Sequence, residues 1–508
     1  MPDSPAIGSL STAGAVLIVS CYELGHQPFA VASAWAELEN AGLGVVGADA
    51  SIETPSEDAL TRAKLVAISV PMHTALRLGV EIARRVRSRN PAAHICFFGL
   101  YASLNATYLL DGLADSVIGG EFESALVELA LGLSRSAPRE SAVRKGAAGE
   151  GAELAERGSP KSILRRLTFH RPKRDGLPPL DKYARLVGPG RDELRVVGYV
   201  EASRGCLHRC LHCPITPVYE GRFFVVPREI VLADARQQIE AGARHITFGD
   251  PDFLNGPGHS MAIVRALHAE HPAVTFDITA KVEHILRHRE LFPELSRLGC
   301  IFVVSAMESL SDRVLEELAK GHTRADIVEA LLIAESAGIA LRPSLLAFTP
   351  WTTLADYLVL CDFIFEQGLI DNVDPIQLAI RLLIPPGSAL LATEEPRPWL
   401  GPLVPSEFGH AWTHPDPTMD RLYTEVSRIV ERGADAKEDA LVTFRCIRSA
   451  AYAAAGQKLV DEPSLRPRRF VPKLTEPWFC CAEPSAAQLG RVASCRPESS
   501  HPPRRHLE

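Results

Sequence analysis

The chain has 508 residues, which is too long for one ordinary domain, so we expect two or three. Its 46% hydrophobic and 23% charged residues indicate a soluble globular protein. The formal net charge of −8 gives no basic field, so nucleic acid is not expected as a partner. The apolar runs are far shorter than the roughly 20 residues that span a bilayer, and the N-terminus shows no signal pattern. We therefore expect a cytoplasmic protein without a membrane partner.

The N-terminal part alternates buried strands with amphipathic helices after a small, polar and presumed disordered segment, residues 1–14. Strands are predicted over residues 15–20, 43–49, 64–69, 94–98 and 116–118, and helices over residues 29–41, 74–89, after 101, and 124–132. This order predicts an α/β domain over residues 15–133 with a doubly wound parallel sheet and ligands at the carboxyl ends of the strands. His26 and His73 follow strands, so they are either ligand contacts or capping and surface residues.

The middle of the chain begins with a break in this pattern. Residues 134–177 are rich in small and charged residues, which predicts a flexible linker. Strands are then predicted over residues 195–201, 245–248, 274–278, 301–305, 340–347 and 375–383, with helices between them. Six βα units predict a partial (β/α)6 barrel over residues 178–390, with its active site at the carboxyl ends of the strands. Residues 391–508 are predicted to form a mainly helical and extended tail.

Three cysteines follow the first barrel strand in the spacing C-x3-C-x2-C: Cys206, Cys210 and Cys213. Three thiolates on one short loop can hold three corners of a [4Fe-4S] cluster and leave the fourth iron open to a small chelating molecule. One alternative is a zinc site, in which His208 or His212 supplies the fourth ligand. Three unrelated core cysteines are the other.

Polar residues also follow the next barrel strands. Gly249 lets the backbone approach a ligand, and Asp250 or Asp252 offers a negative charge to an ammonium group, unless these residues only cap a helix. Alternation places Asp277, Thr279 and Lys281 on one face of their strand, where charges need partners. Further candidates for the same cavity are Ser305, Glu308, Arg342 and Arg381. Internal salt bridges are the alternative for the charged members of this group.

The tail holds adjacent Cys480 and Cys481 in a segment bounded by prolines, and Cys495 lies further on. Neighbouring thiols suit a soft, thiol-seeking centre and can also exchange disulfides. An incidental pair in a disordered tail is the alternative.

Several stretches resemble known families. The cysteine loop with its Glu201-Ala-Ser-Arg-Gly lead-in resembles the cluster loop of radical S-adenosylmethionine (SAM) enzymes. The N-terminal part, including Gly119-Gly-Glu, resembles the cobalamin-binding domain that often precedes such a barrel, but it lacks the Asp-x-His-x-x-Gly signature whose histidine ligates cobalt. The Cys480-Cys-Ala-Glu-Pro tail resembles the signature of a radical SAM family with cysteine or selenocysteine at its second position. That family includes the enzyme of arsinothricin biosynthesis.

This resemblance implies a [4Fe-4S] cluster and SAM as cofactors, a small-molecule substrate, and an electron donor such as flavodoxin or ferredoxin; cobalamin stays open. The implied cluster ligands are Cys206, Cys210 and Cys213, and Cys480 and Cys481 would present arsenic. The implied contacts with SAM are His212, near the adenine, together with Gly249, Asp250, Asp252, Lys281, Ser305, Glu308 and Arg342.

The leading hypothesis is a transferase that moves the 3-amino-3-carboxypropyl group of SAM to trivalent arsenic, such as arsenite. A first alternative is a cobalamin-dependent methylase or ring-modifying enzyme that acts on a small organic substrate. A second alternative, from another class, is a non-catalytic metalloid carrier or sensor.

Overall fold

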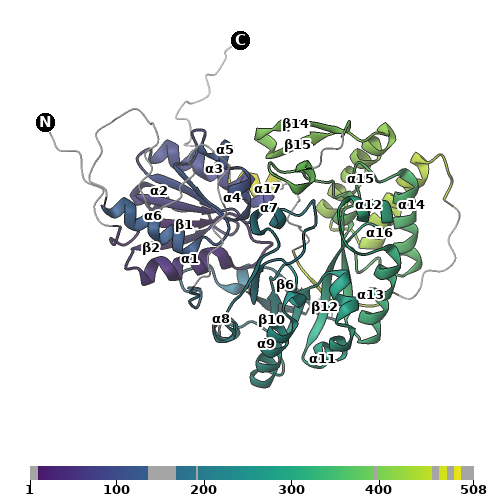
Figure 1. Cartoon of the computed structure of the whole chain (residues 1–508), viewed down its shortest axis with the longest axis horizontal. Coiled ribbons are helices and arrows are strands. Elements are labelled where there is room, and N and C mark those ends of the chain that lie inside the picture. The colour runs from purple at the N-terminus through teal and green to yellow at the C-terminus, as the bar shows by residue number, and fades with distance from the viewer. Residues whose placement is uncertain are drawn as a thin grey trace, which may run out of the picture.

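The computed structural model of the protein describes residues 10–135, 168–189, 193–392, 397–459, 468–476 and 486–493. It contains an N-terminal α/β domain and a barrel, which lie side by side (Figure 1). Most of the predicted disordered N-terminus and of the predicted linker lies outside the described residues. Cys480, Cys481 and Cys495 also lie outside them.

The N-terminal domain is a five-stranded parallel sheet in the order β2-β1-β3-β4-β5, which confirms the predicted doubly wound fold. Successive residues of one strand enter two different cores: Leu17 and Val19 pack with helix α3, whereas Val16 and Ile18 pack with α1 and α6. The strands are β1 (Val16–Ser20), β2 (Val45–Asp49), β3 (Leu65–Ser69), β4 (His94–Phe98) and β5 (Ser116–Ile118). The helices are α1 (Phe29–Asn40), α2 (Glu57–Arg62), α3 (His73–Arg89), α4 (Leu100–Leu104), α5 (Ala106–Leu110) and α6 (Glu123–Arg135).

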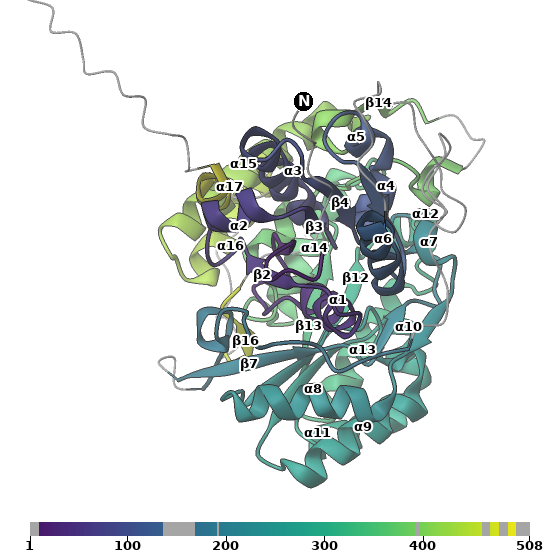
Figure 2. The ribbon, with the colours of Figure 1, turned by 90° about the vertical axis from the view of Figure 1, so that its left-hand side faces the viewer.

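The barrel is an open, curled half-barrel sheet in the order β13-β12-β11-β10-β7-β6-β16. Its five parallel strands are β7 (Leu194–Val200), β10 (His245–Phe248), β11 (Thr275–Thr279), β12 (Cys300–Glu308) and β13 (Ala340–Leu345). Helices cover its outer face: α8 (Arg228–Glu240), α9 (Pro257–Glu270), α10 (Val282–Arg287), α11 (Phe292–Arg297), α12 (Asp312–Glu317), α13 (Arg324–Ser336) and α14 (Leu354–Glu366). In Figure 2, α8, α9 and α11 lie on the side turned away from the N-terminal sheet.

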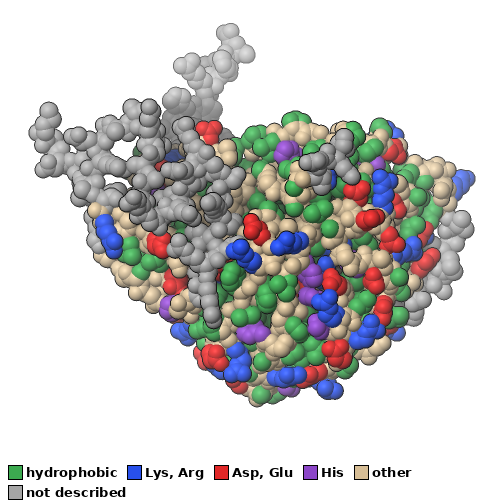
Figure 3. All heavy atoms as spheres, in the orientation of Figure 1, with side chains coloured by type: hydrophobic (Ala, Val, Ile, Leu, Met, Phe, Trp, Pro, Cys, Tyr) green, Lys and Arg blue, Asp and Glu red, His purple; other side chains and the backbone are tan. Residues whose placement is uncertain are grey.

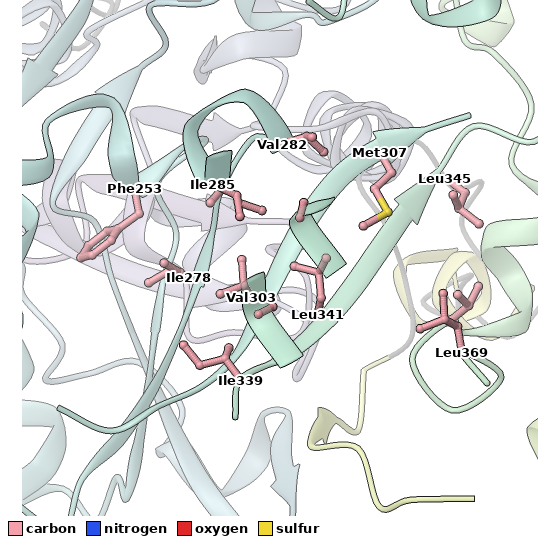
Figure 4. Packing of buried hydrophobic residues seen from close by; sticks show 14 of the residues in the cluster. Phe253, Ile278, Val282, Ile285, Val303, Met307, Ile339, Leu341, Leu345 and Leu369 are labelled. Atoms are coloured by element: carbon pink, nitrogen blue, oxygen red, sulfur yellow. The ribbon is translucent and has the colours of Figure 1, made fainter. Parts of the chain in front are cut away.

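Apolar side chains hold this sheet to its helices. Ile278, Val303 and Leu341, from three neighbouring strands, share one buried cluster with Ile285 of α10 (Figure 4). Each buried side chain of this size contributes about 1.5–3 kcal/mol to folding. The outer face of the sheet is therefore apolar, whereas polar residues gather at the carboxyl ends of its strands.

The prediction of a sixth barrel strand over residues 375–383 is wrong. Residues Pro375–Ala379 form a 3-10 helix instead, and only an isolated bridge between Phe348 and Arg381 continues the sheet. The side chain of Gln377 accepts a hydrogen bond from the Leu345 amide at 2.7 Å, so it takes the donor that a paired strand would have used. A side-chain hydrogen bond therefore replaces the first part of the expected ladder.

The rest of the chain packs around these two sheets. Helices α15 (Pro417–Asp435) and α16 (Ala440–Ala454) cover the barrel near α14, and strands β14 (Leu400–Val404) and β15 (Gly409–Trp412) form a hairpin. Strand β16 (Lys473–Leu474) pairs with β6 (Arg185–Val187), and α17 (Ala486–Ala493) packs against α3. Strands β8 (Ser203–Gly205) and β9 (Phe223–Val225) and helix α7 (Ile215–Tyr219) flank the cysteine loop. No helix among the described residues has both the length and the apolar composition needed to cross a membrane.

The visible surface of the barrel carries mixed charges. Figure 3 shows acidic and basic side chains interspersed over that face, without a broad field of one sign.

Candidate active site

The three cysteines lie on the loop between β8 and α7. None of them is in a disulfide, and Cys210 is buried. Burial raises the pKa of Cys213 to about 12 and also raises the pKa of Cys206, with smaller contributions from the neighbouring thiols. Buried thiols of this kind stay protonated unless a cation stabilises the thiolates, and a metal cluster supplies that charge.

The zinc alternative needs a fourth ligand that the loop histidines do not offer. His212 Nε2 lies 3.3 Å from Glu308 Oε1, and His208 Nε2 lies 3.3 Å from Asp252 Oδ2. Both imidazoles therefore face carboxylates of other elements. Three thiols for which the described residues offer no fourth ligand fit a [4Fe-4S] cluster better than a closed zinc site.

Asp250 and Gly249 form the turn after β10, next to the lead-in of the cysteine loop. Asp250 accepts hydrogen bonds from the Ala202 amide at 2.9 Å and the Ser203 hydroxyl at 2.5 Å. Burial raises the pKa of Asp250 to about 6, against these hydrogen bonds. A Cβ at Gly249 would lie 1.8 Å from the hydroxyl of Tyr199, so only glycine fits there. In the structure Asp250 thus anchors β8, and the predicted contact of both residues with SAM stays a prediction.

Glu308 ends β12 at the mouth of the barrel, with a left-handed φ of 62°. Its Oε1 lies 3.2 Å from the Lys320 ammonium and 3.3 Å from His212. Burial opposes ionisation of Glu308, but Lys320 and His212 outweigh it and lower the pKa of Glu308 to about 2. Nearby, the buried Ser305 hydroxyl has no hydrogen-bond partner within the described part of the chain. The structure thus brings His212, Glu308 and Ser305 to one end of the barrel, where a hydroxylated ligand can use them.

Other predicted cavity residues are engaged inside the protein. Asp277 accepts a hydrogen bond from Thr247 at 2.7 Å and lies 2.8 Å from His245 Nε2. Internal pairs also hold Arg342, to Asp374 at 2.7 Å, and Arg381, to Asp420 at 2.8 Å. These residues form the internal salt bridges and hydrogen bonds that the sequence analysis gave as the alternative to ligand contacts. The assignment of Arg342 to SAM stays a prediction.

Asp252 faces histidines. Its Oδ1 accepts a hydrogen bond from the Leu254 amide at 3.0 Å, and its Oδ2 lies 2.7 Å from His284 Nδ1 and 3.3 Å from His208 Nε2. Burial would raise the pKa of Asp252, but the two histidines lower it. Lys281 lies beside them, with its ammonium 3.2 Å from His208 Nδ1. The contacts of Asp252 and Lys281 with SAM, which the resemblance implies, stay predictions.

Arg204 clamps the cysteine loop to the N-terminal domain. Its guanidinium lies 2.6 Å from Glu123, 3.3 Å from Glu121 and 3.0 Å from Glu201, and it is buried. The Tyr219 hydroxyl donates to Glu121 at 2.8 Å. Arg204 also lies over the rings of Phe29, Phe122 and Phe169. This network joins the lead-in of the cysteine loop to the turn after β5.

The carboxyl ends of the N-terminal strands face the barrel. Ser20 and Ser69 lie in register on β1 and β3, and their buried hydroxyls have no partner among the described residues. Unpartnered hydroxyls at strand ends fit a polar ligand such as the amide side chains of cobalamin. The ring of His26 packs against that of Tyr199, with the ring centroids 4.8 Å apart, and burial lowers the pKa of His26 to about 4. The buried His73 packs against Tyr101 and Phe408. Neither histidine is a surface residue.

Sequence analysis missed several residues of this region: Arg204, Tyr219, Lys320 and His284. Arg204, Tyr219 and His284 meet partners from distant segments of the chain, which local spacing does not identify. The one available signal is charge in an apolar setting: Arg204 follows a buried strand, and His284 follows an apolar one.

Comparison with known proteins identifies the barrel. The model of the family described as "Radical SAM superfamily" matches residues 200–347, which include the three cysteines, Asp250 and Glu308. Residues 200–347 form a radical SAM domain.

The curated proteins that this chain resembles include a methylase and a methylthiotransferase. The hopanoid C-3 methylase of Methylococcus capsulatus is 28% identical over 278 residues, which cover 54% of this chain and 50% of that protein. The ribosomal protein uS12 methylthiotransferase RimO of Geobacter sulfurreducens is 28% identical over 196 residues, or 34% of this chain and 41% of that protein. The chain thus spans half or less of the length of these relatives.

Solved structures share the fold over both domains. The cobalamin-dependent SAM radical enzyme OxsB, with aqua-cobalamin bound, superposes with a TM-score of 0.62 at 14% identity over 82% of this chain and 67% of that chain. The radical SAM methyltransferase TsrM of Kitasatospora setae superposes with a TM-score of 0.54 at 17% identity over 69% of this chain and 71% of that chain. At these identities the likeness concerns the fold.

Proposed function

We propose that this chain is a radical SAM enzyme of the cobalamin-dependent kind, a methylase or ring-modifying enzyme that acts on a small organic substrate. The observation that carries the proposal is the loop of three free cysteines, for which the described residues offer no fourth ligand. This loop lies in the part of the chain that matches the radical SAM superfamily, and Arg204 ties it to the doubly wound domain. When bound, the [4Fe-4S] cluster supplies the electron that cleaves a C–S bond of SAM.

The residues around the loop have separate tasks in this proposal. Cys206, Cys210 and Cys213 hold the cluster, and Asp250 keeps their lead-in in place through Ala202 and Ser203. The ionised, buried carboxylate of Glu308 accepts hydrogen bonds from ribose hydroxyls, because Lys320 keeps it negative without filling all its acceptor sites. His212 stacks or hydrogen-bonds beside the adenine.

Cobalamin, when bound, supplies a second carrier of the transferred group. Ser20 and Ser69 would hold it at the carboxyl ends of β1 and β3, where their hydroxyls have no other partner within the described ranges. The cobalt would have no histidine from an Asp-x-His-x-x-Gly motif, because the sequence lacks that motif. The fold shared with OxsB supports this placement.

The arsenic hypothesis is the second candidate, and one observation favours it. Described residues on either side of Cys480 and Cys481 contact the carboxyl ends of N-terminal strands: Glu476 accepts a hydrogen bond from the Tyr22 hydroxyl at 2.9 Å, and Val492 lines a small pocket with Ala50. Soft trivalent arsenic binds thiols. Both candidates therefore use the same edge of the N-terminal sheet, so the reaction products have to distinguish them.

Product analysis of the anaerobic reaction separates the candidates. The reaction contains reconstituted protein, SAM and a strong reductant, with and without cobalamin and with and without arsenite. We expect SAM cleavage to 5′-deoxyadenosine, and cobalt retained at one per chain after gel filtration. Arsenite-dependent 5′-methylthioadenosine with an arsenic-bearing amino acid would instead establish the second candidate. An intact cluster that never consumes SAM would overturn both and leave a carrier or sensor.

A further inference from the structure

A second group of metal-ligating side chains lies beside the cysteine loop. His208 belongs to that loop, Asp252 follows β10, and His284 lies on α10. One atom of each, His208 Nε2, Asp252 Oδ2 and His284 Nδ1, lies within 4.8 Å of the other two. Three segments that are far apart in the sequence thus present two imidazole nitrogens and one carboxylate oxygen to a common point.

These three atoms are buried, and they face one another at ion-pair distances without forming hydrogen bonds. The side chains of Asp252 and His284 are 2% and 5% exposed, and that of His208 is 14% exposed. Although they lie close together, none of the three atoms has a hydrogen bond of acceptable geometry within the part of the chain that the structure describes. Buried polar atoms in folded proteins almost always have a partner, and an ion is one of the partners that satisfies such a group.

The donor set selects the ion. Two imidazoles and one carboxylate suit Zn²⁺ or Fe²⁺, whereas Mg²⁺ and Ca²⁺ prefer all-oxygen sites. Metal–donor bonds of about 2.0–2.2 Å place neighbouring donors about 3.0–3.5 Å apart. His208 Nε2 and Asp252 Oδ2 already have this spacing at 3.3 Å, whereas His284 Nδ1 and Asp252 Oδ2, at 2.7 Å, would move slightly apart. We propose that His208, Asp252 and His284 bind one divalent transition ion, Zn²⁺ or Fe²⁺, separate from the cluster on the three cysteines.

The surroundings of His208 support this site. A histidine that binds a metal through Nε2 carries its proton on Nδ1 and donates it to a neighbouring carboxylate. Glu283 Oε2 is 3.8 Å from His208 Nδ1, and Lys281 lies 3.3 Å from the same Glu283 oxygen. In the structure the Lys281 ammonium lies 3.2 Å from His208 Nδ1, nearer than Glu283. With the ion bound, Nδ1 carries the proton and faces Glu283, and the Lys281 ammonium turns from Nδ1 to pair with that carboxylate alone. The ion then fixes the cysteine loop to the turn after β10 and to α10, with at least one position left for water or a ligand.

The test measures metal beyond the cluster in the full-length protein. Anaerobic, cluster-reconstituted wild type is equilibrated with buffered Zn²⁺ or Fe²⁺, desalted, and analysed for iron, zinc and acid-labile sulfide. We expect equal iron and sulfide from the cluster plus one zinc per chain in the Zn²⁺ arm, or one iron in excess of sulfide in the Fe²⁺ arm. The zinc absorption edge should show nitrogen and oxygen neighbours at about 2.0–2.1 Å and no sulfur at about 2.3 Å.

Variants assign the ion to its ligands. His284→Asn and Asp252→Asn should lose the extra metal while iron and sulfide of the cluster stay equal. The matched control is His288→Asn, whose ring lies 5.8 Å from that of His284 but outside the group, and it should keep the metal. The inference is overturned if wild type takes up no extra metal, if sulfur appears at the zinc edge, or if His284→Asn retains the metal. These readouts do not depend on SAM cleavage, so the proposed function stands or falls separately.

Discussion

The two parallel sheets of this protein present different chemistry at the same structural position. At the carboxyl ends of the barrel strands lie the cysteine loop, Asp252 and Glu308, all of them groups that carry or bind charge. At the equivalent ends of the N-terminal strands, Ser20 and Ser69 offer neutral hydroxyls, and Asp49 is tied to the Tyr183 hydroxyl at 2.8 Å. In the function proposed above, the barrel would perform the chemistry and the N-terminal domain would hold a neutral ligand. The contacts of Arg204 show that the N-terminal domain also supports the cysteine loop.

Removal of a predicted cluster ligand should have the largest effect on the chemistry of the barrel. Cys213→Ala should abolish SAM cleavage, because two thiolates no longer hold the cluster. Cluster iron, sulfide and 5′-deoxyadenosine formation measure the effect. Cys446→Ala is the matched control, since this half-buried cysteine lies on α16, away from the loop, and it should keep both cluster and turnover. Normal turnover by Cys213→Ala would remove the basis of the account.

Arg204→Met tests the clamp between the two domains. It leaves the buried carboxylates of Glu121 and Glu123, and the partly buried one of Glu201, without their cation, which should cost about 3–5 kcal/mol of unfolding free energy. Denaturant titration measures the loss, and the cluster content should fall with it. The control is Arg236→Met, which breaks an exposed pair with Glu270 and should cost about 0–1 kcal/mol. Equal losses in the two variants would show that the clamp has no special weight.

The smallest effect is a pH dependence at the domain contact. The ring of His26 packs against that of Tyr199, and burial lowers the pKa of His26 from 6.5 to about 4. Between pH 6.5 and 4 the unfolded chain therefore binds a proton at His26 that the folded chain does not. The contribution of His26 to the free energy of unfolding should therefore fall as the pH drops from 6.5 to 4. Glu23 and Glu201 have pKa values raised by burial to about 7 and about 8, so they act with the opposite sign.

The contribution of His26 to the pH dependence of stability is the difference between wild type and a His26 variant. His26→Phe keeps a ring against Tyr199 and should lose the part of the pH dependence between 6.5 and 4, as measured by denaturant titration at several pH values. Identical pH profiles for wild type and variant would mean that His26 is not protonated on unfolding in this range.

Sequence predicted the framework well for a physical reason. Strands buried on both faces read as apolar runs between amphipathic helices, and each N-terminal strand begins within two residues of its predicted start. The sixth barrel strand failed because Gln377 supplies an acceptor to Leu345 through its side chain, which hydrophobic periodicity does not reveal. Cysteine spacing could predict a cluster loop because the three candidate ligands lie close together in the sequence, and their assignment as cluster ligands stays a prediction.

The rest of the site was beyond local patterns. Arg204 meets Glu121 across more than eighty positions, and His284 meets His208 across more than seventy, so only the fold brings them together. Cys480 and Cys481 lie outside the described residues, so their predicted delivery of arsenic rests on the sequence and on the contacts of Glu476 and Val492.

Electron paramagnetic resonance of the reduced protein tests the central claim most directly. The account predicts one reduced [4Fe-4S] signal per chain that shifts when SAM is added, because the iron without a protein ligand binds SAM. The shift should be absent in Cys213→Ala and present in Cys446→Ala. A well-formed cluster signal in wild type that SAM leaves unchanged would contradict the account.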